Sequence, residues 1–298
     1  MVPPRSLDGS NLGRSHLGLS HWRFAGHLGL ASPDAPLLAR SARSVDPLDQ
    51  IEALADLGFA GFEDIYLKQR PPAVQVQMAR RMATRGITLG TFNGDPQHWT
   101  TPLWSSTDPA AQAQLRRNLD QSIALIATMG SGNAVCVAGL DPALPRASQH
   151  AGMAENLRRL GEVAAAHGLT LLVEAVARAW IPGLLIDRVA DAAALVRGVN
   201  LPNVRLLFDT GHAAMEGLDV PAALAEVADI LGAVQIADVP CGHAPARTDP
   251  GVGTLNWPAI FQCLGQCGYS GLIEVEHDPA ERTAQGEARL IARLAQLG

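Results

Sequence analysis

Four apolar segments of this 298-residue chain each carry, toward their carboxyl end, a side chain that presents an oxygen atom. Short, continuous apolar runs are typical of parallel strands buried on both faces, and the carboxyl ends of parallel strands meet at one edge. Carboxylate and amide oxygens suit Mg2+ or Mn2+ better than they suit zinc or copper. The pattern therefore predicts one divalent metal ion, Mn2+ or Mg2+. Its predicted ligands are Glu174 after LTLLV, Asp209 after VRLLF, Gln235 within GAVQI and Glu276 after GLIEV.

Such an ion could hold two adjacent oxygens of a substrate and stabilise the enediolate that forms when a C–H proton leaves. Glu174 and Glu276 would face each other across the ion, one as the general base and the other as the acid that returns the proton. His212, which follows Asp209 by three residues, would donate a hydrogen bond to a substrate oxygen. The predicted catalytic residues are therefore Glu174, Glu276 and His212.

Each of these residues also has a purely structural interpretation. A carboxylate at a strand end often caps the next helix, and a single histidine such as His212 is more often a satisfied core or surface residue. Gln235 could bond only to the backbone, and Glu63, near the end of another apolar run, could form a salt bridge at the rim. The joint placement of four oxygen donors at strand ends favours the functional interpretation.

Eight apolar segments alternate along the chain with eight segments that have helical patterns. Strict alternation implies a parallel sheet, and eight units of this length favour a closed (β/α)8 barrel, whose active site lies at the carboxyl ends of the strands. A doubly wound open sheet is the alternative, and the absence of a Gly-x-Gly-x-x-Gly turn after any strand disfavours it. The predicted strands cover residues 24–30, 59–67, 87–93, 133–139, 169–175, 204–209, 232–238 and 271–277.

A single α/β domain is predicted over residues 23–298, preceded by a loosely ordered tail over residues 1–22 that is rich in Pro, Gly and Ser. Residues 94–108 contain Trp99 and Trp104 and form a long loop of the kind that serves as a lid or binding loop. Residues 139–150 are predicted to be another loop, before a helix over residues 154–168, and the final helix is predicted to begin at Pro279.

Composition excludes several classes of protein. The net charge is −6 with no run of basic residues, which argues against a nucleic-acid partner, and no apolar segment is long enough to cross a membrane. The four cysteines lack zinc-type spacing, so free thiols in a reducing cytoplasm are the simplest interpretation. These features predict a cytoplasmic protein whose partner is a small molecule.

The segments around the four oxygen donors resemble the xylose isomerase-like barrels, and within them the hydroxypyruvate isomerase family. The resemblance extends over roughly residues 24–295 and is most specific in the second half. It implies the same four metal ligands, two glutamates that move the proton, and a small ketose or hydroxy-keto acid as substrate. It also implies a homo-oligomer, either a dimer or a tetramer. The motifs that carry it are LLVEA with IPG, FDTGH with MEG, VQIADVP with GTLN, and GYSGLIEVEH.

The chain departs from the family pattern at two places. Ala177 stands where the family often has asparagine, and Cys241-Gly242 stand where it usually has an arginine that clamps a carboxylate, which leaves Arg247 as the nearest substitute. A neutral sugar or a glycoside-derived ketone is therefore an alternative substrate. The residues predicted to contact substrate are Glu63, Asn93, Arg178, His243 and Arg247.

Three other functions remain open at this point. A lyase, either a dehydratase or a C-glycoside-cleaving enzyme, would use the same site and the same proton abstraction. A metal-dependent DNA-repair endonuclease shares the barrel but needs more histidine ligands and a basic face, neither of which the sequence shows. A non-catalytic binding barrel would be expected to have lost the metal carboxylates, and here they are intact.

Overall fold

The computed structural model describes residues 22–241 and 245–297, and within them all strands run parallel in one sheet. The strand order is β3-β2-β1-β9-β8-β7-β6-β5-β4, so the two end strands of the sheet are consecutive in the chain and the sheet closes on itself. The fold is thus the predicted single-domain (β/α)8 barrel. The strands are β1 (Arg23–His27), β2 (Gly61–Glu63), β3 (Thr88–Leu89), β4 (Thr91–Asn93), β5 (Asn133–Cys136), β6 (Thr170–Glu174), β7 (Val204–Asp209), β8 (Leu231–Ile236) and β9 (Leu272–Val275).

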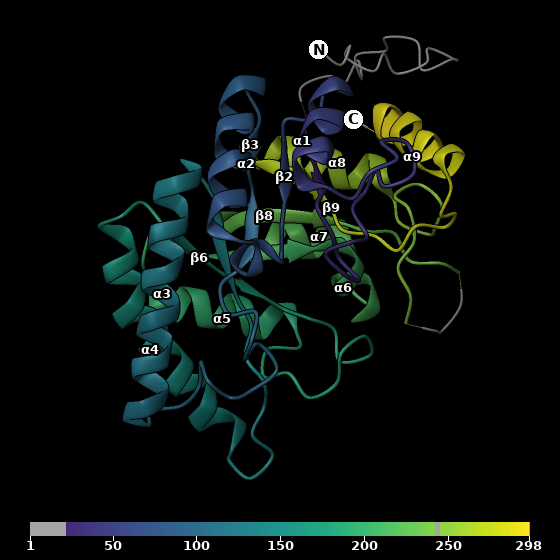
Figure 1. Ribbon diagram of the computed structural model, residues 1–298. Helices are drawn as coiled ribbons and strands as arrows, with labels where there is room; N and C mark the ends of the chain where they lie inside the picture. The colour runs from purple at the N-terminus through teal and green to yellow at the C-terminus, as the bar shows by residue number, and fades with distance from the viewer. Residues whose placement is uncertain (1–21, 242–244, 298) are drawn as a thin grey trace.

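Helices follow the strands and lie outside the ring that the strands form (Figure 1). None of the helices in the described ranges is long and apolar enough to span a bilayer. The predicted tail lies outside the described residues except for Trp22, whose ring packs 5.3 Å from that of Phe261. The helices are α1 (Pro47–Asp56), α2 (Pro72–Arg85), α3 (Pro109–Met129), α4 (Arg146–Ala165), α5 (Val189–Val199), α6 (Thr210–Met215), α7 (Val220–Glu226), α8 (Trp257–Gln266) and α9 (Ala284–Leu297), with 3-10 turns at Leu67–Gln69 and Ala228–Ile230.

The predicted third strand is divided at Gly90 into β3 and β4. The side chain of Glu274, from β9, occupies the space where a Cβ of residue 90 would lie. The backbone N–H of Thr91 then donates to Glu274 Oε1 (2.6 Å) instead of to a neighbouring strand. Gly90 itself still bonds to both neighbours, because its N–H donates to Phe62 and its carbonyl accepts from Asn133. The barrel therefore closes through a glycine that makes room for a buried acid.

Several predicted boundaries were wrong, and three of them have the largest differences from the structure. The second strand ends at Glu63, because the next carboxylate, Asp64, accepts the N–H of Tyr66 (3.1 Å) and turns the chain. Helix α4 begins at Arg146, well before residue 154, and includes Gly152, where a Cβ would overlap the carbonyl of Ser105. That glycine allows a helix and a loop to approach closely and does not break the helix. Helix α9 begins at Ala284 instead of Pro279.

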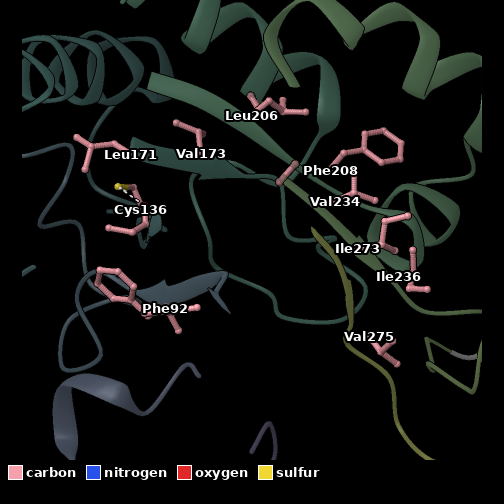
Figure 2. Close-up of a cluster of buried hydrophobic side chains, with 14 of the residues drawn as sticks. Phe92, Cys136, Leu171, Val173, Leu206, Phe208, Val234, Ile236, Ile273 and Val275 are labelled. Atoms are coloured by element: carbon pink, nitrogen blue, oxygen red, sulfur yellow. Dashed lines mark hydrogen bonds between the residues drawn. The ribbon is translucent and has the colours of Figure 1, made fainter. Parts of the chain in front are cut away.

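Because side chains point alternately to the two faces of each strand, the apolar residues of the sheet form two separate clusters, one outside the barrel and one inside it. Leu206, Phe208 and their equivalents on neighbouring strands belong to the large core cluster that includes helix residues (Figure 2). Leu207 belongs to a separate, smaller cluster with Leu172 and Ala233, which fills the inside of the barrel. Because side chains alternate with a period of two, the residue two positions beyond Leu207 also points inward, and that residue is Asp209. The same argument extends from Leu172 to Glu174 and from Ala233 to Gln235.

Candidate active site and metal centre

Asp209, the last residue of β7, uses its two carboxylate oxygens for different contacts. Its Oδ1 accepts the backbone N–H of His212 (2.7 Å), so it caps helix α6 as the structural interpretation predicted. Its Oδ2 accepts from the guanidinium of Arg247 (2.8 Å). The same carboxylate therefore fixes the start of a helix and contributes charge to a buried cluster, and the two interpretations of the residue are compatible.

Arg247 lies among three carboxylates, those of Glu174, Asp209 and Glu276, which together form the acidic cluster. Its Nη1 is 3.0 Å from Glu276 Oε1, and its Nη2 is 2.7 Å from His212 Nε2. The arginine side chain is only 5% exposed, and its guanidinium carbon lies 5.5 Å from the ring centroid of Trp180. Because a guanidinium can only donate, His212 Nε2 is the acceptor and the imidazole proton is on Nδ1.

Burial and mutual repulsion determine the protonation of the cluster. Burial, together with the carboxylates of Glu276 and Asp209, raises the pKa of Glu174 well above its ordinary value. Burial also raises the pKa of Glu276, against the opposing effect of Arg247. The pKa of His212 is well below its ordinary value because the ring is buried and faces Arg247. The site therefore contains a neutral imidazole and two glutamates that hold protons more tightly than free glutamates do.

The donor set fits a divalent cation. One ligand atom each from Glu174, Asp209 and His212 lie within 4.8 Å of one another. Glu276 Oε2 and Gln235 Oε1 are buried oxygens without a hydrogen-bond partner, and an unpaired buried oxygen is costly unless a cation or donor satisfies it. In this structure the guanidinium of Arg247 supplies positive charge beside Asp209 and Glu276.

A second polar layer lies inside the barrel, formed by Glu63, Thr91, Gln235 and Glu274. Gln235 Nε2 donates to Glu63 Oε2 (2.8 Å), and Thr91 Oγ1 donates to Glu274 Oε2 (2.7 Å). Sequence reasoning missed Thr91 and Glu274. The signal was present in the segment IEVEH, because Glu274 and Glu276 are two positions apart and so point to the same face of the strand.

The residues predicted to contact substrate are distributed over several environments. Glu63 has no exposed surface, and Asn93, at the end of β4, uses its Oδ1 to accept the N–H of Asp95 (2.9 Å). Arg178 is 68% exposed and pairs with Asp187 (2.7 Å) instead of joining the acidic cluster. Arg247 does join that cluster, and His243 lies outside the described residues.

A cavity of about 670 Å3 is lined by the loops that follow β1 and β9. His27 and His277 line it with ring centroids 5.7 Å apart, and His277 directly follows Glu276 in the chain. Neither ring nitrogen of His27 has a hydrogen-bond partner. The residues that line the cavity do not include Glu174, Asp209, Arg247 or Glu276, so its lining is distinct from the acidic cluster.

Taken together, this geometry suits proton transfer at carbon. Two buried glutamates with raised pKa values flank a position that holds positive charge, and a neutral histidine lies beside them. General acid–base catalysis needs groups whose pKa values lie near the working pH, and burial moves both glutamates in that direction.

Comparison with known proteins agrees with the fold. Over 241 residues the chain is 30% identical to the 2-oxo-tetronate isomerase of Cupriavidus necator, covering 80% of this chain and 90% of that protein. It is 28% identical over 249 residues to the hydroxypyruvate isomerase of Escherichia coli, covering 81% and 91% of the two chains. A solved structure described as an AP endonuclease, family 2, from Brucella melitensis superimposes with a TM-score of 0.75 at 25% identity, covering 91% of this chain and 98% of that one.

The resemblance inferred from the strand-end motifs is thereby confirmed. Residues 51–294 match the family described as Xylose isomerase-like TIM barrel. This match includes every strand after β1 and all four predicted metal ligands. The chain belongs to the xylose isomerase-like TIM barrel family.

Proposed function

We propose that the protein is a divalent-metal-dependent isomerase or epimerase that moves a proton between adjacent carbons of a small ketose or hydroxy-keto acid. The observation that carries the proposal is the convergence of Glu174, Asp209 and Glu276 on one buried position that holds positive charge. The names of the curated relatives, 2-oxo-tetronate isomerase and hydroxypyruvate isomerase, support the same class of reaction and substrate.

The ion would be held by Glu174, Asp209, Gln235 and Glu276. When bound, Mn2+ or Mg2+ supplies positive charge that stabilises an enediolate. One of the two glutamates, in its ionised form, takes the proton from the substrate carbon, and the other, in its protonated form, delivers a proton to the adjacent carbon or to the opposite face.

Arg247 would donate to substrate oxygens, and His212 Nε2, which carries no proton, would accept from a substrate hydroxyl. If Asp209 binds the ion, the guanidinium of Arg247 would be available to form two parallel hydrogen bonds with a substrate carboxylate. Trp180, against which Arg247 lies, limits the access of water to these charges, and the exclusion of water strengthens each of these electrostatic contacts.

A lyase would use the same first step, and the products distinguish the two reactions. In an isomerase the substrate and product have the same composition, whereas a lyase releases water or another leaving group. The endonuclease function suggested by the name of the Brucella structure is disfavoured, because the chain has 29 acidic residues against 23 basic ones and no basic stripe to bind phosphates.

The decisive experiment is solvent exchange. Protein stripped of metal and then supplied with Mn2+ or Mg2+ is incubated in D2O with hydroxypyruvate, 2-oxo-tetronate and a panel of ketoses, and loss of the C–H signal is followed by proton NMR. We expect metal-dependent exchange with at least one of these compounds.

Substitution of Glu276 tests the assignment of the proton shuttle. We expect Glu276→Gln to slow exchange by about 100-fold to 10,000-fold, the usual contribution of a general acid or base, while the circular dichroism spectrum stays unchanged. Glu287→Gln is the matched control, because Glu287 is a buried glutamate that accepts from the backbone N–H groups of Arg40 and Ser41, outside the acidic cluster. Undiminished exchange by Glu276→Gln would refute the proposed shuttle.

A further inference from the structure

The amide of Gln235 is held in one orientation inside the barrel. Its Nε2 lies 2.8 Å from Glu63 Oε2 and 3.5 Å from Thr91 Oγ1. Its Oε1 is buried and has no hydrogen-bond partner. Gln235 is 3% exposed and Glu63 is 0% exposed, so water does not compete for either group.

The chemistry of the two side chains determines which end of the amide faces Glu63. An amide has a donor end and an acceptor end, and the Glu63 oxygen that faces it, Oε2, accepts the hydrogen bond from Gln235 Nε2. Rotation of the amide by half a turn would place Gln235 Oε1 against a carboxylate oxygen and would lose the hydrogen bond. In a buried site, that repulsion is not relieved by solvent. Glu63 therefore directs the amide oxygen away from itself.

The other side of Gln235 adjoins the metal centre. Gln235 pairs in register with Asp209 on β7, and Asp209 is part of the acidic cluster. An amide can bind a hard cation only through its oxygen. The orientation imposed by Glu63 leaves that oxygen unpaired, as a metal ligand must be before the ion arrives.

Glu63 is itself fixed from across the barrel. Thr91, on β4, lies 3.3 Å from Glu63 Oε2 through its hydroxyl, and the same hydroxyl donates to Glu274 at 2.7 Å. Glu274 uses its other oxygen to accept the backbone N–H of Thr91 (2.6 Å). Glu63 therefore belongs to a hydrogen-bonded network with Thr91 and Glu274. A rotation of the Glu63 side chain would break its contact with the Thr91 hydroxyl.

We propose that Glu63 is a positioning residue that selects the metal-binding orientation of the Gln235 amide. This inference rests on the proposed function, because it assigns Gln235 as a ligand. It gives Glu63 a different role from the substrate contact predicted from the sequence. Glu63 would influence the reaction only through Gln235.

The test measures Mn2+ affinity directly, by calorimetry or by the electron paramagnetic resonance signal of free Mn2+, without any substrate. In Glu63→Gln the new amide can donate to Gln235 Oε1, so the orientation is no longer selected. We expect the dissociation constant for Mn2+ to rise by about 10-fold to 100-fold, the usual effect of removing a group that orients a metal ligand.

Two further variants test whether the orientation of the Gln235 amide is what determines the affinity for Mn2+. Glu274→Gln makes the same carboxyl-to-amide change in the same layer, but both oxygens of Glu274 are engaged by Thr91, so we expect a smaller loss of affinity. The double variant Glu63→Gln/Gln235→Glu should recover most of the affinity, because a carboxylate at position 235 binds an ion through either oxygen and accepts from the amide through the other. Such coupling between two positions is what a double-mutant cycle measures.

The outcomes distinguish this inference from the proposed function. If the wild-type protein does not bind Mn2+, the proposed metal site fails, and the inference fails with it. If the wild type binds Mn2+ and Glu63→Gln binds it equally well, only the positioning role is overturned. Equal losses in Glu63→Gln and Glu274→Gln would also overturn it, because they would show that the loss of either carboxyl group has the same effect. Thermal unfolding of metal-free protein checks that each variant is folded.

Discussion

Replacement of Arg247 by methionine should destabilise the metal-free protein strongly. Arg247 lies 2.8 Å from Asp209 Oδ2 and 3.0 Å from Glu276 Oε1, and the exposures of the three side chains are 5%, 0% and 17%. Burial by itself lowers the pKa of Arg247, but Asp209, Glu276 and Glu174 more than reverse this effect, so the guanidinium stays charged. Methionine fills a similar volume without charge and leaves these carboxylates without a cation.

The size of the effect follows from the burial. Removal of one partner of a buried ion pair costs about 3–5 kcal/mol, because the remaining charge stays desolvated. For a domain of this size, each kcal/mol lowers the melting temperature by roughly 2–4 °C. We therefore expect the melting temperature of chelator-treated Arg247→Met to lie roughly 6–20 °C below that of the wild type.

Added Mn2+ should reverse much of this loss, because the ion and the guanidinium compete for the same carboxylates. The assay is thermal unfolding of wild type and variant, each with chelator and with excess Mn2+. Arg70→Met is the matched control: Arg70 pairs with the fully buried Asp64 at 2.5 Å, away from the acidic cluster. That variant should be destabilised, and Mn2+ should not raise its melting temperature by more than it raises that of the wild type.

Two results would refute this reasoning. A melting temperature of metal-free Arg247→Met equal to that of the wild type would show that the guanidinium does not compensate the buried carboxylates. An identical Mn2+-induced increase in wild type and Arg247→Met would show that the ion and the arginine occupy separate positions. The expected result is a larger Mn2+-induced increase in the variant.

Two other substitutions test, respectively, the metal ligand Asp209 and the effect of the buried His27 on stability at low pH. Asp209→Asn should abolish the Mn2+-induced increase in melting temperature, which for the wild type corresponds to about 2.7 kcal/mol of stabilisation when the Mn2+ concentration is 100 times Kd. Asparagine still caps α6, so the helix should be retained. An unchanged increase would rule out Asp209 as a ligand. His27→Asn tests pH dependence: burial and then His277 lower the pKa of His27 well below 6.5. The unfolded chain therefore binds an additional proton below pH 6.5, and the wild type should lose stability relative to the variant by up to about 1.4 kcal/mol per pH unit as the pH falls. A difference in unfolding free energy that stays constant between pH 7.5 and 5 would contradict this expectation.

The alternation of strands and helices, and the inward direction of the four predicted metal ligands, could be predicted from local patterns. A strand repeats every two residues, so the apolar residues before Glu174 and Asp209 already determine which face those carboxylates occupy. Parallel strands in a barrel bring their carboxyl ends to one face. Strand existence and side-chain direction are thus properties of short segments, and short segments are visible in the sequence.

Contacts between distant segments could not be predicted in this way. Gln235 and Glu63 are 172 residues apart in sequence yet 2.8 Å apart in space, and Glu274 reaches across the barrel to divide the predicted third strand at Gly90. Such contacts depend on how the barrel closes and on which side chains fill its interior. Neither is encoded in the periodicity of one segment.

The loops also show which features the sequence predicts and which only the tertiary structure reveals. The sequence gives no reason to prefer Arg247 over Arg178 as the cation near the carboxylates, because both lie shortly after a strand that carries a predicted ligand. Only the tertiary structure places Arg247 between Asp209 and Glu276 and pairs the exposed Arg178 with the buried Asp187. The sequence by itself determined the barrel and the ring of oxygen donors, because strand periodicity is local. The tertiary structure decided which charged groups balance those donors, because packing between distant segments determines which groups are desolvated together.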